Sequence, residues 1–246
     1  MKITSLQHPL VKHLVKLQND SRYRQTQKTF VLEGFKPLKE VAKHIKKLLY
    51  TASVAQQVTM EVAERIEVTD EILQKISGMK SSEGVLAEVE MLPFVSPVDW
   101  KFMVALDGVN DPGNVGTLMR TALAFGWDGL LFLPNCCDPY NEKVLRAARG
   151  AHFKLPMAKG TIQDLKSLIQ QGYEPLVADI KGKDPGMYMY QRVDKRILVL
   201  GNEACGPSSQ VVELCQSVSI PMQGEMESLN VSVAGGILLY LMQKGR

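Results

Sequence analysis

Five polar residues stand out because they occur in three short segments that combine flexible turns with side chains able to contact a ligand. They are Asn114 and Arg120 in residues 107–120, Glu203 in residues 201–207, and Ser228 and Asn230 in residues 227–234. Two of the segments directly follow an apolar run, and the third lies across a short polar loop from one, which is where α/β proteins place ligand-contacting groups. Amides, a hydroxyl, a carboxylate and a guanidinium could together orient a polar substrate and clamp an anion. These residues therefore indicate an enzyme.

The elements that must position these residues alternate between buried strand and amphipathic helix. In that order, the predicted elements are Phe102–Leu106, Val115–Phe125, Gly129–Leu133, Glu142–Ala148, Phe153–Met157, Thr161–Gln171, Pro175–Ala178, Arg196–Leu200 (a second strand in succession), Ser209–Cys215, Ser217–Pro221 and Leu229–Gln243. Such alternation predicts an α/β fold whose mostly parallel sheet is covered on both faces. Ligands bind beyond the carboxyl ends of parallel strands, so the three segments are expected to meet at one rim.

The region before this pattern predicts a small, separate α/β domain. Its predicted helices are 9–17, 37–47 and 71–79, and its predicted strands are 29–32, 48–52 and 84–91. Two prolines, Pro93 and Pro97, bracket a few residues and stiffen the chain, which suits a linker. We therefore predict domains at 1–97 and 98–246.

The charge of the chain is concentrated in its first 50 residues. Residues 1–50 hold eleven Lys and Arg against three Asp and Glu, a formal charge of +8, whereas the whole chain carries +3, which leaves −5 for the remainder. A basic module on a mildly acidic body is typical of proteins that bind phosphate chains, because counterion release drives such binding. For Lys43, Lys46 and Lys47 taken alone, a solvated helical face is the preferred interpretation. The charge therefore favours a partner that carries a chain of phosphates.

Composition describes an ordinary globular protein of 246 residues, with 45% hydrophobic and 22% charged residues. Neither an apolar signal core nor a membrane-spanning run is present, so we expect a cytoplasmic location and no membrane partner. The four cysteines, Cys136, Cys137, Cys205 and Cys215, show no metal-ligand spacing. We expect reduced thiols and no metal site.

Several familiar nucleotide and hydrolase sites are excluded by single residues. The first segment lacks G-x-G-x-x-G, which argues against a dinucleotide-binding site. In residues 201–208 Pro207 stands where a P-loop needs its lysine, so the β- and γ-phosphates would lose their main counter-charge. No H-E-x-x-H or G-x-S-x-G motif occurs, so no motif supports a hydrolase.

The three segments, taken in order, resemble the three motifs of the SpoU/TrmH family of RNA 2′-O-ribose methyltransferases, in the SPOUT superfamily. The matching runs are 106–122, 200–206 and 228–234, and the resemblance is strong over residues 100–243. The N-terminal region is similar to the family's small RNA-recognition domain, less distinctively. This resemblance implies a C-terminal SPOUT α/β domain with a deep trefoil knot, a rare exception to the rule that chains avoid knots.

The resemblance also implies a cofactor and an oligomeric state. S-adenosyl-L-methionine would sit in the knotted loops, held mainly by backbone groups. The implied cofactor-binding residues are Leu200, Gly201, Glu203, Gly206, Ile220, Met222 and Leu229. Family members are usually homodimers whose site is completed across the subunit interface, which we carry over as an expectation.

Arg120 matches the family's catalytic arginine. A guanidinium stays protonated up to a pKa above about 12, so it is a poor base; clamping the phosphate of the target and lowering the pKa of the ribose hydroxyl suits it better. Proton transfer through that phosphate stays open. Asn114 would orient the arginine or the substrate, although capping a helix explains an Asn there equally well.

The remaining implied catalytic residues are Glu203, Ser228 and Asn230. For Glu203 we favour a structural or dimer-contacting role near Arg120 over a general base. Ser228 and Asn230 open a helix, so they could cap it, position substrate or cofactor, or do both. His152 is expected to be structural.

Two classes of function remain. The first is S-adenosylmethionine-dependent methylation of a ribose 2′-hydroxyl in structured RNA, with 23S-type ribosomal RNA favoured over transfer RNA because a separate N-terminal domain suggests a complex recognition site. The second is a non-catalytic RNA-binding or ribosome-assembly protein with the same fold. The intact set of polar residues favours the enzyme.

Overall fold

The protein folds into two compact units, seen in a computed structural model that describes residues 1–78, 82–189, 193–223 and 228–243. One unit comprises Met1–Leu92 with Tyr140–Leu145, and the other comprises Pro93–Pro139 with Arg146–Arg246. The chain thus changes unit between Leu92 and Pro93. The domains at 1–97 and 98–246, with a function assigned to each, stay a prediction.

The first unit is built on a mixed five-stranded sheet in the order β1-β4-β3-β5-β2. Its strands are β1 (Lys2–Ile3), β2 (Thr29–Glu33), β3 (Ile45–Tyr50), β4 (Arg65–Val68) and β5 (Val85–Glu90). β5 runs antiparallel to both of its neighbours, whereas β1, β4 and β3 are mutually parallel.

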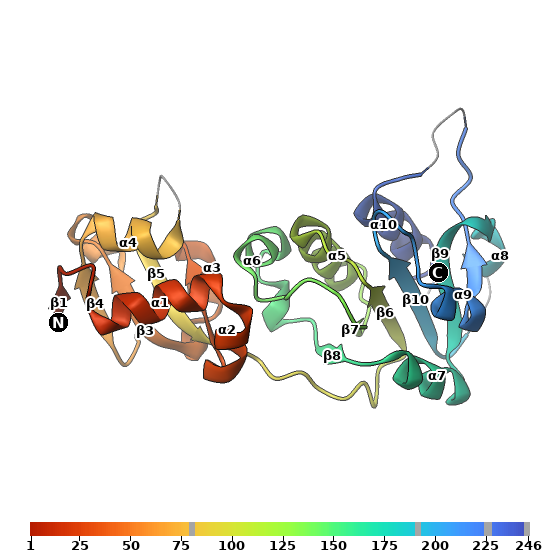
Figure 1. The fold of residues 1–246 in the computed structure, drawn as a ribbon, viewed down its shortest axis with the longest axis horizontal. Helices are drawn as coiled ribbons and strands as arrows, with labels where there is room; N and C mark the ends of the chain where they lie inside the picture. Colours follow the sequence, from red (N-terminus) through yellow and green to blue (C-terminus); the bar gives the residue numbers. More distant parts are fainter. Residues whose placement is uncertain (79–81, 190–192, 224–227, 244–246) are drawn as a thin grey trace. The chain divides into compact units, whose positions relative to one another are not determined.

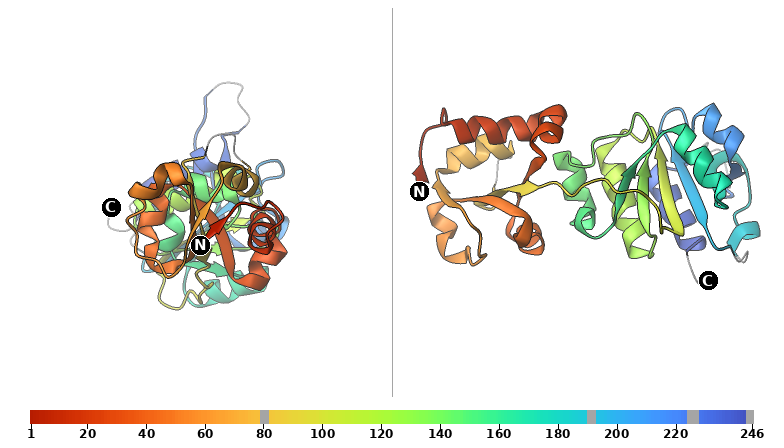
Figure 2. Two further views of the ribbon diagram at one scale, coloured as in Figure 1. Left: turned by 90° about the vertical axis from the view of Figure 1, so that its left-hand side faces the viewer. Right: turned by 90° about the horizontal axis from the view of Figure 1, so that it is seen from below.

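Helices cover both faces of this sheet. They are α1 (Pro9–Asn19), α2 (Ser21–Gln27), α3 (Phe35–Glu40) and α4 (Asp70–Ser77), with short 3-10 turns η1 (Ala42–His44) and η2 (Ala52–Gln57). Figure 2 shows α1 and α4 on one face and α3 on the other. Apolar side chains at helical spacing on α1, Val11, Leu14 and Leu17, are fully buried against Leu49 and Leu86 of the sheet. Burial of this stripe, rather than helix propensity, fixes the helix.

The second unit is a six-stranded, fully parallel sheet in the order β11-β9-β10-β6-β7-β8 (Figure 1). Its strands are β6 (Phe102–Asp107), β7 (Gly129–Phe132), β8 (Met157–Lys159), β9 (Glu174–Lys183), β10 (Arg196–Gly201) and β11 (Gln216–Val218). Every residue of β6 and of β10 is buried, as expected for central strands covered on both faces. The predicted mostly parallel sheet is confirmed.

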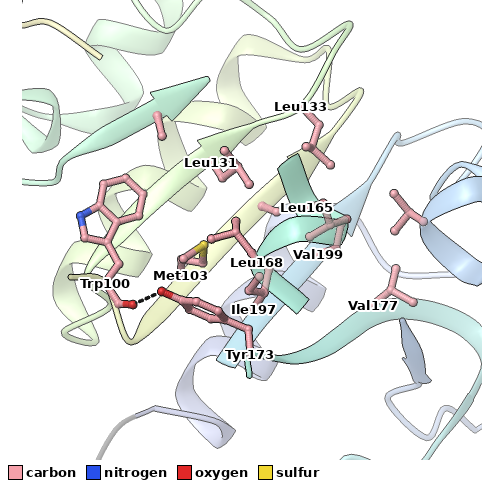
Figure 3. Close-up of a cluster of buried hydrophobic side chains, with 13 residues drawn as sticks. Trp100, Met103, Leu131, Leu133, Leu165, Leu168, Tyr173, Val177, Ile197 and Val199 are labelled. Carbon is pink, nitrogen blue, oxygen red and sulfur yellow. Dashed lines mark hydrogen bonds between the residues drawn. The ribbon is translucent and has the colours of Figure 1, made fainter. Parts of the chain in front are cut away.

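Two layers of helices enclose this sheet. They are α5 (Pro112–Ala124), α7 (Ile162–Gln170), α8 (Gly186–Met189), α9 (Ser209–Leu214) and α10 (Val231–Leu241), with the 3-10 turn η3 (Ala151–Phe153). The remaining helix, α6 (Glu142–Ala148), is divided between the two units after Leu145. Figure 1 shows α5 and α10 on one side of the sheet and α7 on the other. On the α7 side, Trp100, Met103, Leu165 and Ile197 belong to one buried apolar cluster, where the Tyr173 hydroxyl donates to the Trp100 carbonyl (Figure 3).

Some predicted elements were wrong for a tertiary reason. Residues 37–47 were expected to form one helix, but α3 ends at Glu40 and β3 begins at Ile45, because Ile45, Leu48 and Leu49 pair with β5. Residues 153–157 were expected to be a strand, yet η3 ends at Phe153 and β8 begins at Met157.

In the described part of the chain, no helix combines the length and apolarity that crossing a membrane requires.

Candidate functional site

The first segment forms a loop and the first turn of α5 at the carboxyl end of β6. Asp111 caps the helix, since its Oδ1 accepts from the backbone N–H of Asn114 at 2.9 Å, and Pro112 occupies the first turn. Both are standard helix-start residues. The cap is therefore Asp111, and Asn114 is a buried residue inside the first turn, free to use its side chain elsewhere.

The side chain of Asn114 meets Glu203, which lies after β10. Its Nδ2 donates to Glu203 Oε1 at 3.0 Å, and the same carboxylate accepts the backbone N–H groups of Asn110 and Asp111, both at 3.2 Å. Burial alone would raise the pKa of Glu203, but the hydrogen bonds from Asn114 and from backbone N–H groups outweigh it and hold the pKa below its ordinary 4.5. Glu203 is thus ionised and holds the start of α5 in place. This arrangement suits a structural role better than the role of a general base.

Asn202 shapes the turn that presents Glu203. Its Oδ1 accepts from the N–H groups of Ala204 at 2.9 Å and Cys205 at 3.1 Å, while its Nδ2 donates to the Gly108 carbonyl at 2.8 Å. Asn202 and Gly206 also exchange backbone hydrogen bonds. Sequence reasoning gave Asn202 no role of its own, although an Asn beside a glycine-flanked turn is a signal for this kind of side chain to backbone bonding.

Gly201 allows the chain to cross itself closely. A Cβ there would stand 2.2 Å from the backbone nitrogen of Pro207, and Gly206 holds a φ of +72°. The turn is also tied to β6, because buried Asp107 accepts the Ser208 N–H on its Oδ2 at 2.7 Å. The first two segments therefore form one hydrogen-bonded unit.

The third segment opens α10. Asn230 caps this helix, with its Oδ1 accepting from the Ser232 N–H at 2.8 Å and from the Ser232 hydroxyl at 2.7 Å. Further along α10, a Cβ at Gly235 would lie 2.5 Å from Leu118 Cδ2 of α5 and 2.8 Å from Leu200 Cδ1 of β10. This close packing sets the start of α10 beside the turn after β10.

The three segments leave a pocket of about 640 Å³, a size typical of small-molecule sites. Of the predicted residues, those that line it are Gly201, Glu203, Gly206, Ile220, Met222, Ser228, Leu229 and Asn230. Leu200 is not among the lining residues and lies fully buried in β10. Residues 178–181 of β9 also line the pocket and were missed, because the predicted strand ended at Ala178.

Arg120 and Asn114 do not line this pocket. Arg120 is exposed on α5, and its guanidinium makes no hydrogen bond or ion pair with the described residues. The structure thus brings Glu203, Ser228 and Asn230 to one cavity, joins Asn114 to it through Glu203, and leaves Arg120 outside.

The walls suit a nucleoside-like ligand. The turn 201–207 offers backbone polar groups at close range, because Gly201 has no side chain to hold a ligand away, and Ile220, Met222 and Leu229 supply apolar surface. No group of three or more His, Cys, Asp or Glu that could hold a metal ion occurs among the described residues. His152 is buried away from the pocket, where burial lowers its pKa to about 4 and its Nε2 lies 2.6 Å from the Pro139 carbonyl oxygen.

Comparison with known families decides what this arrangement is. Residues 101–240 match the model of the SpoU rRNA Methylase family, and residues 8–87 match the MRM3-like substrate binding domain. The chain belongs to the SpoU rRNA Methylase family. The predicted family and enzyme class are confirmed, and this SpoU-family chain is an RNA methyltransferase.

Similar proteins cover nearly the whole of this SpoU-family chain. An uncharacterized tRNA/rRNA methyltransferase of Synechocystis sp. is 32% identical, over 97% of this chain and 92% of its own length. The 23S rRNA (guanosine(2553)-2′-O)-methyltransferase RlmP of Bacillus subtilis is 27% identical, over 97% and 98%. A crystal structure of an AdoMet-bound rRNA methyltransferase from Sinorhizobium meliloti superposes with a TM-score of 0.84 at 27% identity, over 98% and 97%. The predicted α/β fold class with a small N-terminal α/β domain is confirmed.

Proposed function

We propose that this protein transfers the methyl group of S-adenosyl-L-methionine to a ribose 2′-hydroxyl of 23S-type ribosomal RNA in the cytoplasm. The observation that carries the proposal is the pocket at which the turn 201–207, Ile220 and the start of α10 converge, with Glu203 linking it to Asn114. The names of the Bacillus and Sinorhizobium relatives support both the ribosomal substrate and the cofactor.

The cofactor is S-adenosyl-L-methionine, which supplies an electrophilic methyl group on a sulfonium. The backbone of the turn 201–207 would bind its polar edges, while Ile220, Met222 and Leu229 would pack against its flat apolar surface. Leu200 would not touch the cofactor but would support the turn 201–207, because its side chain is fully buried at the end of β10. Ser228 and Asn230 would position the cofactor or the substrate, since both line the pocket, and Asn230 also caps α10.

The ribose hydroxyl must be aligned with the methyl group and must lose its proton. Alignment alone is worth several kcal/mol, on the order of 7–11 in favourable cases. The exposed Arg120 guanidinium suits a clamp on the adjacent phosphate that lowers the pKa of the hydroxyl. Asn114 orients the start of the helix that carries Arg120, and Glu203 holds Asn114.

A second copy of this chain completes the site. On α10, Val233, Ile237 and Tyr240 form a stripe at helical spacing with exposed fractions of 52%, 37% and 43%. An exposed apolar stripe of this kind is typical of a subunit interface. Pairing through α10 would carry Arg120 of one subunit to the pocket of the other, which accounts for its position outside the pocket of its own chain. We include in the proposal a trefoil knot formed where the C-terminal chain passes the turn 201–207.

The test is methyl transfer from radiolabelled S-adenosylmethionine to total RNA from cells that lack this activity, followed by nuclease digestion and mapping. A labelled 2′-O-methylated nucleotide in 23S-type RNA is the expected result. Label in transfer RNA would overturn the proposed ribosomal substrate but leave the proposed 2′-O-methyl transfer standing. Binding of RNA and cofactor without transfer, even to intact ribosomal subunits, would favour a non-catalytic RNA-binding protein.

A further inference from the structure

One wall of the pocket comes from the second half of β9. The pairing of β9 with β10 ends at Val177, opposite Val199, and β9 then continues to Lys183, which pairs with Val218. Between these points, residues 178–181 line the pocket. The register of β9 against β11 shifts across this stretch, from Ser217 opposite Val177 to Val218 opposite Lys183.

Two opposite charges stand on this wall. Asp179 and Lys181 are two positions apart in β9, and both line the pocket. Oδ1 of Asp179 accepts the backbone N–H of Lys181 at 3.0 Å, which holds the carboxylate in place. Within the described part of the chain, Oδ2 of Asp179 and the ammonium of Lys181 have no hydrogen-bond or ion-pair partner.

The other charged residue lining the pocket is already occupied. Glu203 accepts three hydrogen bonds from Asn110, Asp111 and Asn114. Among the described lining residues, the carboxylate of Asp179 and the ammonium of Lys181 are therefore the charges left for a ligand. A ligand that carries one ammonium and one carboxylate close together would match both.

We propose that Asp179 and Lys181 bind the amino-acid end of the cofactor. Asp179 accepts from the α-ammonium group and Lys181 donates to the α-carboxylate, two charge-assisted hydrogen bonds of opposite polarity. The adenine and ribose are uncharged and are left to the backbone turn and the apolar wall. This inference rests on the proposed function, because it assumes that the pocket binds S-adenosylmethionine.

The pair would make the protein distinguish the full cofactor from its nucleoside part. 5′-Methylthioadenosine has the same adenosine but a neutral thioether in place of the sulfonium, and it has no amino-acid end to reach Asp179 and Lys181. Comparing how each variant changes the Kd of the two ligands isolates the contribution of this pair, because the missing sulfonium charge affects the wild type and the variants alike, and binding can be measured without RNA.

The experiment is isothermal titration calorimetry of the full-length protein with S-adenosylmethionine and with 5′-methylthioadenosine. The variants are Asp179→Asn, which keeps an oxygen to accept the Lys181 N–H, and Lys181→Gln. Matched controls are Glu213→Gln and Lys183→Gln, two exposed residues that do not line the pocket. Lys181→Arg retains the charge and should rescue binding.

Each pocket variant should raise the Kd for S-adenosylmethionine about tenfold and change that for 5′-methylthioadenosine less than about twofold, since only charge-assisted bonds to the amino-acid end are lost. The loss of S-adenosylmethionine affinity in each pocket variant should be smaller at high salt, because Asp179 and Lys181 are both partly exposed and salt screens exposed charges. Equal weakening of both ligands, or no weakening of either, would overturn the inference while leaving the proposed function standing. A wild-type protein that binds neither ligand would overturn both.

Discussion

The side-chain amide of Asn114 donates a hydrogen bond to Oε1 of Glu203 across 3.0 Å, although the two residues are 89 positions apart in the chain. Glu203 uses the rest of its carboxylate on the N–H groups of Asn110 and Asp111. One ionised side chain thus fixes both the start of α5 and the turn that walls the pocket. Perturbing it should affect site geometry more than global stability, because Glu203 itself is exposed.

Glu203→Gln should lower the free energy of unfolding by about 1 kcal/mol, since charged hydrogen bonds are lost but solvent screens an exposed group. It should lower kcat about a hundredfold, because misplacement by about 1 Å costs that much. Urea denaturation and single-turnover kinetics measure the two effects. The exposed α9 variant Glu213→Gln is the control and should change neither.

The contribution of Glu203 to stability should depend on pH. Its folded pKa lies below 4.5, so folding favours the ionised form. The stability that this supplies is fully present above about pH 5 and is lost as pH falls through the folded pKa. The stability difference between wild type and Glu203→Gln should therefore shrink in acid. A difference that grows as pH falls from 5 would contradict this assignment.

Gly201→Ala should weaken cofactor binding more than about tenfold, because its Cβ would stand 2.2 Å from the Pro207 nitrogen and the turn would have to move. Gly236→Ala in α10 is the matched control, since the nearest atom to its Cβ is 3.9 Å away. Calorimetric titration with S-adenosylmethionine provides the measurement. Unchanged affinity for Gly201→Ala would show that the turn does not bind the cofactor.

Arg120→Ala should lower kcat about 10²- to 10³-fold, the usual loss of one group that stabilises developing charge. The Kd for S-adenosylmethionine should not change, because the proposed clamp holds the phosphate of the RNA and not the cofactor. Loss of cofactor binding with normal turnover at saturation would rule out the phosphate clamp. Mixing Arg120→Ala with Gly201→Ala subunits should restore part of the activity if the site is shared between subunits.

His152 should make the fold less stable in mild acid. Its pKa is lowered from 6.5 to about 4, so the unfolded chain binds the extra proton between these values. Stability should therefore rise with pH from about 4 to 6.5 by this residue's contribution, with no further gain above. Chemical denaturation of wild type and His152→Asn across this range gives the contribution as their difference. A constant difference would refute the assignment.

The fold and the location of the site were largely predictable because they depend on local patterns. Buried runs such as Ile197–Leu200 followed by Gly201 mark a parallel strand and the turn after it, whatever surrounds them. Asn230 was recognisable as a helix cap from residue type and position alone. The helix predicted over 37–47 was wrong at its end because Ile45 fits a helical stripe and a strand equally well, and only pairing with β5 decided between them.

Local pattern was enough to place the turn 201–207 after a strand and Asn230 at the start of a helix, because strand ends, turns and caps are encoded within a few positions. The folded chain decided which distant residues these segments meet, since Arg120 and Asn114 do not line the pocket whereas residues 178–181 do. Only when β6 and β10 lie side by side does Glu203 reach Asn114, and only when β9 runs past its last pairing with β10 do Asp179 and Lys181 join the pocket. These contacts join residues that are far apart along the chain, and local propensity carries no record of which distant partner will satisfy a side chain.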